Sequence, residues 1–254
     1  MKRSRVLLFL AVIVGALCLL FSCDPKVEDI QYRVGNKGPT GGYIFYDCDA
    51  DNDSGNADGL ISTECGWRFL EAAPADLRIV DGIPTIDSSV SGYSSASYYF
   101  RYGYYRISES ESNLYVNGTA SYNLSDCTGE TVGTGRRNTQ LLVGAMGDET
   151  YSDYSGSNKT AEYAAKMCDD LTYIVKGVTY SDWFLPSKDE LNQMYIKLYK
   201  ASLGGLDASY WSSSEGDSGF NAWRQIFDNS LGTGGIQDDY GRGNYNHIRP
   251  VRAF

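Results

Sequence analysis

The chain has 254 residues, a formal net charge of −10 at pH 7 and 42% hydrophobic residues. This length suits one large domain, or less well two small ones, and it is sufficient to bury a core. The acidic balance, with no basic patch interleaved with aromatic residues, argues against nucleic acid and anionic membrane surfaces as partners.

The first 23 residues have the order of a bacterial secretion signal. An apolar stretch, 6–21, follows three basic residues, and Ser22 lies directly before Cys23. The apolar stretch is shorter than the roughly 20 residues that a membrane-spanning helix needs, and polar residues follow it at once. We therefore predict a cleaved signal peptide, residues 1–22, with a retained anchor helix as the alternative.

The end of this leader resembles the lipobox of bacterial lipoproteins, in which the cysteine thiol receives a diacylglyceryl group before cleavage. Several acyl chains on Cys23, each methylene contributing about 0.8 kcal/mol, make membrane anchoring stable. Removing 22 residues with three positive charges leaves a mature chain of 232 residues and a net charge of −13. We expect a lipid-anchored protein at the outer membrane and cell surface.

The mature chain opens on a polar tether, residues 23–33, and we predict a domain at residues 34–254. A turn cluster at 38–42 precedes an aromatic, β-prone run at 43–46, and a second strand is expected at 67–71. Further on, residues 86–125 are dominated by Ser and Tyr and lack the aliphatic periodicity of a core element, so we expect long loops or edge hairpins there.

Helices are expected in the middle of the chain. Asn138 or Thr139 is a candidate cap for a short helix through Met146, and a second helix places the small and apolar residues of 161–171 on one face. The clearest signal is the capping box at 187–190, in which a serine and a glutamate satisfy each other's backbone N–H groups. An apolar stripe follows it, and the glycines at 204–205 are expected to stop that helix.

Beyond that helix the sequence is strand-like and punctuated by glycine. Strands are predicted at 210–214, 222–227 and 248–254. Short strands with a few interposed helices, without an alternating βαβ rhythm, predict an α+β fold rather than a parallel sheet.

Four cysteines remain in the mature domain: Cys48, Cys65, Cys127 and Cys168. In an oxidising compartment they allow two disulfides in three connectivities, which the sequence alone does not separate. Cys48 and Cys65 flank one loop between two expected neighbouring strands, so we predict that they pair and leave Cys127 to Cys168. No two of the four have the close spacing of a zinc or redox site, so a structural role is expected.

Six segments occur in order along nearly all of residues 34–254: GPTGGYIFY at 38–46, GWRFLEAAP at 66–74, GTGRRNT at 133–139, DWFLPSKDEL at 182–191, YWSSSE at 210–215 and RPVRAF at 249–254. Together they resemble the C-terminal domain of collagen-like bacterial adhesins. The resemblance implies a C-type-lectin-like fold related to the formylglycine-generating enzyme. The chain departs from this pattern in the Ser/Tyr insertion and at Phe184, where many members carry arginine. Because fold does not determine function, no ligand follows from the resemblance.

Residues that suit catalysis are scarce. His247 is the only histidine, and it precedes the last expected strand, where a structural role outweighs catalysis. The oxidase relatives of the fold depend on cysteine chemistry, yet no cysteine follows Cys168. No spacing singles out the paired carboxylates of a glycoside hydrolase. We therefore expect a protein that is not an enzyme, with a hydrolase as the weak alternative.

An acidic loop, 47–59, offers a candidate cation site. Asp49, Asp51 and Asp53 place carboxylates at alternate positions, Asp58 follows, and Ca²⁺ takes six to eight oxygen ligands. Glycine comes at the seventh position from Asp49 rather than the sixth, and no glutamate closes the loop in register. Calcium is thus the one candidate cofactor, and a solvated acidic loop is the alternative.

Ligand contacts are expected on the loops between the C-terminal strands, since loops on a rigid scaffold carry binding. Trp183, Trp211 and Trp223 would suit sugar platforms, but each lies in a segment also expected to build the core. The Tyr-rich stretch at 98–105 is expected to extend the ligand surface. The candidate contact residues are Asp217, Phe220, Asn221, Asp228, Asn229, Asp238, Asp239, Tyr240, Arg242, Asn244 and Tyr245.

These observations favour a membrane-anchored surface protein that binds an extracellular glycan or protein without catalysis. The alternative from another class is a structural or envelope-assembly lipoprotein that faces the periplasm.

Overall fold

The computed structural model describes residues 32–49, 66–90, 95–103, 128–151, 158–216, 221–230 and 232–254. They belong to one compact unit, Tyr32–Phe254. The predicted signal peptide, Cys23 and the tether up to residue 31 lie outside the described residues. Within the described ranges, no helix has the length and apolar character needed to cross a membrane.

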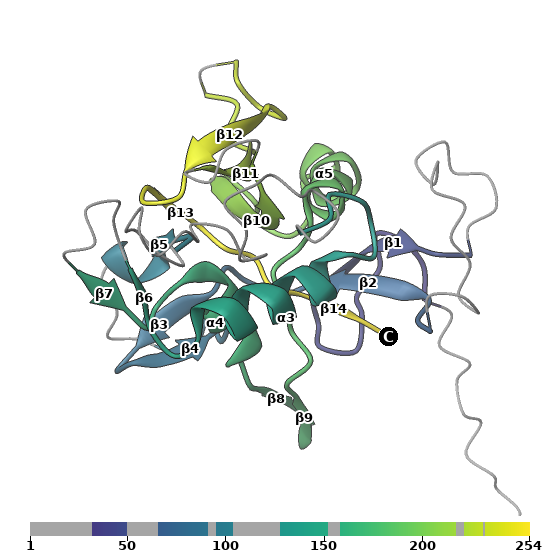
Figure 1. Ribbon diagram of the computed structural model, residues 1–254. Helices are drawn as coiled ribbons and strands as arrows, with labels where there is room; N and C mark the ends of the chain where they lie inside the picture. The colour runs from purple at the N-terminus through teal and green to yellow at the C-terminus, as the bar shows by residue number, and fades with distance from the viewer. Residues whose placement is uncertain are drawn as a thin grey trace, which may run out of the picture. The chain divides into compact units, whose positions relative to one another are not determined.

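This unit is an α+β domain of short antiparallel strands and a few helices, as predicted (Figure 1). The helices are α3 (Gly135–Met146), α4 (Ala164–Asp169) and α5 (Lys188–Lys197), with 3₁₀ turns at Ser95–Tyr98 and Tyr199–Ala201. The strands are β1 (Tyr43–Asp47), β2 (Phe69–Ala72), β3 (Arg78–Val80), β4 (Ile83–Thr85), β5 (Phe100–Arg101), β6 (Thr150–Tyr151), β7 (Lys159–Thr160), β8 (Tyr173–Val175), β9 (Val178–Tyr180), β10 (Ser209–Glu215), β11 (Asn221–Ile226), β12 (Gln237–Gly241), β13 (Tyr245–Asn246) and β14 (Val251–Ala253).

Two three-stranded sheets organise the domain. One has the order β1-β2-β14, so the last strand of the chain pairs with the second, and the other has the order β10-β11-β12. Four two-stranded pairs, β13-β5, β3-β4, β6-β7 and β8-β9, complete the described strands. Sequence reasoning missed the hairpins β3-β4 and β8-β9, because each strand has only three residues and shows no full period of alternation.

The core consists of two clusters of buried apolar side chains. One gathers around Trp211 and includes side chains of α3 and α4, and the other lies between α5 and the β1-β2-β14 sheet. Trp211 is fully buried, and its indole Nε1 donates to the Phe100 carbonyl oxygen at 2.8 Å, so burial leaves its one donor satisfied. Trp211 therefore fixes β10 in the core, and β10 in turn supports β11 and β12, which pair beside it.

The capping box predicted at the start of α5 is confirmed. Ser187 Oγ accepts from the Glu190 backbone N–H at 3.2 Å, and Glu190 Oε2 accepts from the Ser187 N–H at 2.8 Å. Leu191, Met194 and Leu198 are fully buried, as the apolar stripe indicated. The helix nevertheless ends at Lys197, and the 3₁₀ turn that follows ends at Ala201, with Ser202 in the left-handed conformation. The glycines at 204–205 lie beyond this end, so the predicted stop is wrong.

The predicted start of α3 is wrong. The helix begins at Gly135, three residues before Asn138, and Asn138 is buried inside it. The Asn138 amide donates to the Gly129 carbonyl and accepts from the Gly129 N–H, so it holds the preceding loop instead of capping the helix. Gly135 has no room for a side chain, because a Cβ there would clash with the Glu190 carboxylate. This close contact joins the first turn of α3 to the first turn of α5.

Candidate functional site

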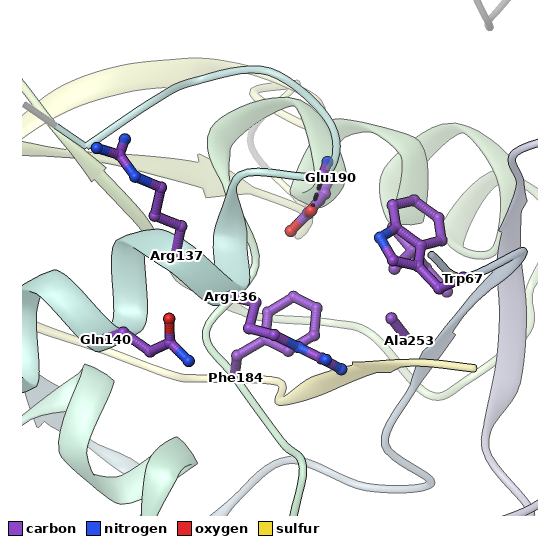
Figure 2. A pocket seen from close by; sticks show the side chains of 9 residues that line it. Trp67, Arg136, Arg137, Gln140, Phe184, Glu190 and Ala253 are labelled. Carbon is purple, nitrogen blue, oxygen red and sulfur yellow. Dashed lines mark hydrogen bonds between the residues drawn. The ribbon is translucent and has the colours of Figure 1, made fainter. Parts of the chain in front are cut away.

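A pocket of about 230 Å³ opens beside the first turns of α3, and we call it the α3 pocket (Figure 2). Its walls come from α3, α5, the approach to β2, the segment before α5, and β14. The lining residues are Trp67, Leu70, Gly133, Arg136, Arg137, Gln140, Phe184, Glu190 and Ala253.

Glu190 forms one wall of the α3 pocket through a buried carboxylate. Its Oε1 accepts from the Gly133 N–H at 2.8 Å, and Oε2 accepts from the Ser187 N–H at 2.8 Å. Burial raises the pKa of the Glu190 carboxyl to about 7, although these backbone N–H groups and the Arg136 charge favour the ionised form. Burial therefore favours the neutral form of this carboxyl.

Arg136 is held on the opposite wall by an aromatic ring and a carboxylate. Its guanidinium carbon lies 5.4 Å from the centroid of the Phe184 ring, and its Nη2 lies 3.9 Å from Asp182 Oδ2. Asp182 is already engaged by Arg252, which donates to both carboxylate oxygens at 2.9 and 3.0 Å. Figure 2 shows the Arg136 side chain lying along Phe184, with the Trp67 ring across the pocket.

Sequence reasoning did not single out the α3 pocket. Its residues lie in segments for which the sequence predicts strands, helices or a family resemblance but no site, and Glu190 is predicted only as part of a helix cap. A signal was nevertheless present, because two adjacent arginines, Arg136 and Arg137, stand out in a chain with ten more acidic than basic residues.

Five of the nine predicted ligand residues that the structure describes lie on strands, so the expectation of loops is wrong for these five. Asn221 begins β11, three candidates lie on β12, and Tyr245 begins β13. The glycine-rich, polar composition of 232–246 hid these strands, because residues facing solvent on an outer strand need not be apolar. Asp228, Asn229 and Asn244 do lie in connections, while Asp217 and Phe220 lie outside the described residues. We call the described part of 221–246 the β11–β13 surface.

Arg242 does not present its side chain on that surface. It is 1% exposed, its Nη2 donates to Glu215 Oε1 at 2.5 Å, and its Nε donates to the Asn221 carbonyl oxygen at 2.9 Å. Removing one partner of such a buried pair leaves an uncompensated charge. Arg242 therefore holds the end of β12 against β10 and is a poor candidate for ligand contact.

Two tyrosines on the β11–β13 surface are supported by arginines. Tyr240 lies opposite Ala222 across β11-β12, and the guanidinium carbon of Arg224 lies 3.4 Å from its ring centroid. Arg224 also donates to both oxygens of Asp238, at 2.7 and 3.0 Å. Tyr245 is 54% exposed, and Arg101 lies 4.5 Å from its ring centroid. Each ring is thus fixed by a cation–π contact before any ligand arrives.

Asp239 and Asn221 lie on the opposite side of the same strands. Asn221 Nδ2 donates to Asp239 Oδ2 at 3.0 Å, and Trp223 faces Asp239 across the pair of strands. Trp183 and Trp211 are buried in the core as expected, but Trp223 is only half-buried, and Lys188 Nζ lies 3.4 Å from its ring centroid. Trp223 therefore belongs to the surface rather than to the core.

His247 is part of a partly buried polar cluster. Its Nδ1 lies 2.9 Å from Asp76 Oδ2, and Arg249 Nε donates to Asp76 Oδ1 at 2.7 Å. Tyr98 stacks on the imidazole at 5.8 Å, and Tyr99 meets it edge-on at 4.9 Å. Arg249 is 2% exposed and also donates to backbone carbonyls, which fits a structural role for the cluster.

Few of the residues predicted to bind calcium or to form disulfides are described. Asp49 is described, and its Oδ2 lies 3.7 Å from Arg68 Nε, while Asp51, Asp53 and Asp58 lie outside the described residues. Across the described ranges, no cluster of three or more potential metal ligands occurs. Cys48 and Cys168 are both buried, in different core clusters, and their predicted partners, Cys65 and Cys127, lie outside the described residues.

No family model matches the chain, and no curated protein shows significant similarity to it.

Proposed function

We propose that the chain is a lipid-anchored bacterial surface protein whose C-type-lectin-like domain binds an extracellular glycan or protein and catalyses no reaction. The leader and its lipobox-like ending at Cys23 support the anchor. The α+β architecture of short antiparallel strands, with the last strand beside β2, supports the finer fold. As part of this proposal, the lipid anchors the domain to the outer membrane, and the domain faces the cell surface.

One observation carries the binding proposal, namely the exposed but preordered ring of Tyr245. An exposed aromatic side chain offers a large contact area, and tyrosine loses little conformational entropy on binding. Arg101 already contacts the ring and also donates to the Gly243 carbonyl oxygen at 2.6 Å. The Tyr245 side chain therefore loses part of its conformational entropy on folding, and less is lost when a ligand binds. Tyr240, with Arg224 and Asp238, adds a second ring with charged hydrogen-bonding groups beside it.

The test is binding of the soluble domain, residues 24–254, to arrays of glycans and extracellular matrix proteins. Replacing Tyr245 with alanine should weaken binding to any captured ligand by about tenfold or more, as for an aromatic hot spot, and Tyr240→Ala should act in the same direction. Ile174→Ala is the matched control, because Ile174 is an exposed apolar residue on the β8-β9 hairpin. Arg242 is unsuitable for this test because its removal would destabilise the fold.

Unchanged binding in Tyr245→Ala, or equal losses in the Ile174 control, would place the ligand surface elsewhere. Replacements at Tyr98 and Tyr99 would then test the neighbouring Tyr-rich stretch. Wild-type protein that captures no glycan or protein on either array would contradict the binding function.

The anchor and its location are tested in cells. Metabolic labelling with a fatty acid should mark the wild type and not a Cys23→Ser variant. Protease treatment of intact cells should remove the domain if it faces outward, whereas protection from protease would favour the structural, periplasmic alternative.

We also keep calcium at Asp49, Asp51, Asp53 and Asp58, and the pairs Cys48–Cys65 and Cys127–Cys168, as proposals. Calcium that binds only the folded state should raise the melting temperature of a chelated sample, and no shift at millimolar calcium would remove the proposal. Non-reducing peptide mapping tests the pairing, and a link from Cys48 to Cys127 or Cys168 would refute it.

A further inference from the structure

The α3 pocket shares no residue with the β11–β13 surface, so its function is a separate question. Its charge differs from that of the chain as a whole. Arg136 and Arg137 line it against one acidic residue, Glu190, whose carboxyl is fully buried. A pocket with a positive balance in a protein of net charge −10 favours an anionic ligand.

Arg136 retains donors for such a ligand. A guanidinium has five N–H donors, and the contact of Arg136 with Asp182 is long, at 3.9 Å, because Arg252 occupies both Asp182 oxygens. Its side chain is 46% exposed. Gln140 lies one helical turn further along α3, on the same face as Arg136, and adds an amide that both donates and accepts.

The remaining walls are apolar and aromatic. The Trp67 ring is half-buried and lies across the pocket from Arg136, and Phe184 is 3% exposed at the base (Figure 2). Flat rings of this kind suit the apolar face of a ring-shaped ligand. Glu190 is 0% exposed, and its oxygens accept from the backbone N–H groups of Gly133, Gly135 and Ser187, so this residue shapes the wall and is not itself offered to a ligand.

We propose that the α3 pocket binds an acidic monosaccharide. Arg136 takes the carboxylate, Trp67 contacts the sugar ring, and Gln140 exchanges hydrogen bonds with ring hydroxyls. A carboxylate and a guanidinium form a pair of parallel charged hydrogen bonds, which is the strongest contact the pocket offers. The volume of about 230 Å³ lies below the roughly 300 Å³ at which pockets for drug-sized ligands begin, and this limits the ligand to about one sugar residue.

The proposal is tested with glucuronate on the soluble domain, by ligand-observed NMR titration, with glucose and acetate as comparisons. Glucose has the ring without the carboxylate, and acetate has the carboxylate without the ring. Glucuronate should bind more tightly than either one. Arg136→Gln should weaken its binding by about tenfold or more, because the charged hydrogen bonds are lost. Trp67→Ala should weaken it as well, whereas Trp67→Phe should retain most of the affinity.

Arg68→Gln is the matched control, because Arg68 is an exposed arginine that neighbours Trp67, pairs with Asp47 and does not line the pocket. Arg136 is exposed on a helix and glutamine is a good helix former, so Arg136→Gln should lose only the weak contacts with Phe184 and Asp182 and its melting temperature should stay close to that of the wild type. No binding of glucuronate, equal binding of glucose or acetate, or equal losses in Arg68→Gln and Arg136→Gln would each overturn the proposal. These outcomes are independent of the Tyr245 variants, so failure here leaves the proposed function intact.

Discussion

The buried carboxyl of Glu190 makes a prediction about stability and pH. Its pKa is raised by burial from 4.5 to about 7. Between these two values the folded state binds a proton that the unfolded state has released. The free energy of unfolding therefore falls as the pH rises through this window, and the full cost of ionising Glu190 is present above pH 7. Below about pH 4.5 both states are protonated and the cost vanishes.

The size of the effect follows from the shift. One pKa unit corresponds to about 1.36 kcal/mol, so a shift of roughly 2.5 units costs about 3 kcal/mol at high pH. Glutamine at this position cannot ionise and removes that cost. It also places an amide where the N–H groups of Gly133 and Ser187 donate, and this lowers the free energy of unfolding by the same amount at every pH. The difference in free energy of unfolding between the wild type and Glu190→Gln should thus change by about 3 kcal/mol between about pH 4 and pH 8.

Urea unfolding of both proteins across this pH range measures the difference. Other shifted groups, such as Glu71 and Asp76, are common to both proteins and cancel in the subtraction. Glu162→Gln, the same substitution at an exposed glutamate, is the control. Parallel stability curves for the wild type and Glu190→Gln would show that burial does not raise the Glu190 pKa, and the reasoning would fail.

Three further predictions concern the core and its buried groups. Asp76→Asn weakens the contact with the buried Arg249 and should lower the free energy of unfolding by about 3–5 kcal/mol, measured by urea unfolding; a loss under about 1 kcal/mol would mean that the pair is not buried. Trp211→Phe removes the donor to the Phe100 carbonyl and leaves a void, and calorimetry should show a loss of about 2–4 kcal/mol. Burial raises the pKa of the Cys168 thiol well above its usual value, so after reduction Cys168 should resist iodoacetamide until the protein unfolds; mass spectrometry that finds rapid alkylation in native buffer would contradict its burial.

The sequence predicted best where a local rule is strong. The capping box at Ser187 and Glu190 places α5 to the residue, because both partners of the motif lie within one turn. The β-prone runs at 43–46 and 210–214 became β1 and β10, since aromatic and apolar residues mark a strand that is buried.

The sequence predicted poorly where distant contacts decide. Asn138 has the composition of a helix cap, but its amide bonds to Gly129 and Ser213, and the latter lies 75 positions away. The polar strand β12 is held by its pairing with β11 and by the Arg224–Asp238 bonds, none of which shows in local composition. The α3 pocket combines residues from five separate segments, so only the folded chain brings Trp67, Arg136 and Glu190 together.

The place of β14 in its sheet also makes folding of the domain depend on contact between segments far apart in the sequence. The partner of β14 is β2, so the β1-β2-β14 sheet joins residues 69–72 to residues 251–253. Phe254 takes part as well, because its N–H donates to the Phe69 carbonyl oxygen at 3.0 Å. Until β14 docks, one edge of β2 has unsatisfied backbone groups that invite wrong pairing or cleavage. A variant that lacks residues 251–254 therefore loses the closure of this sheet.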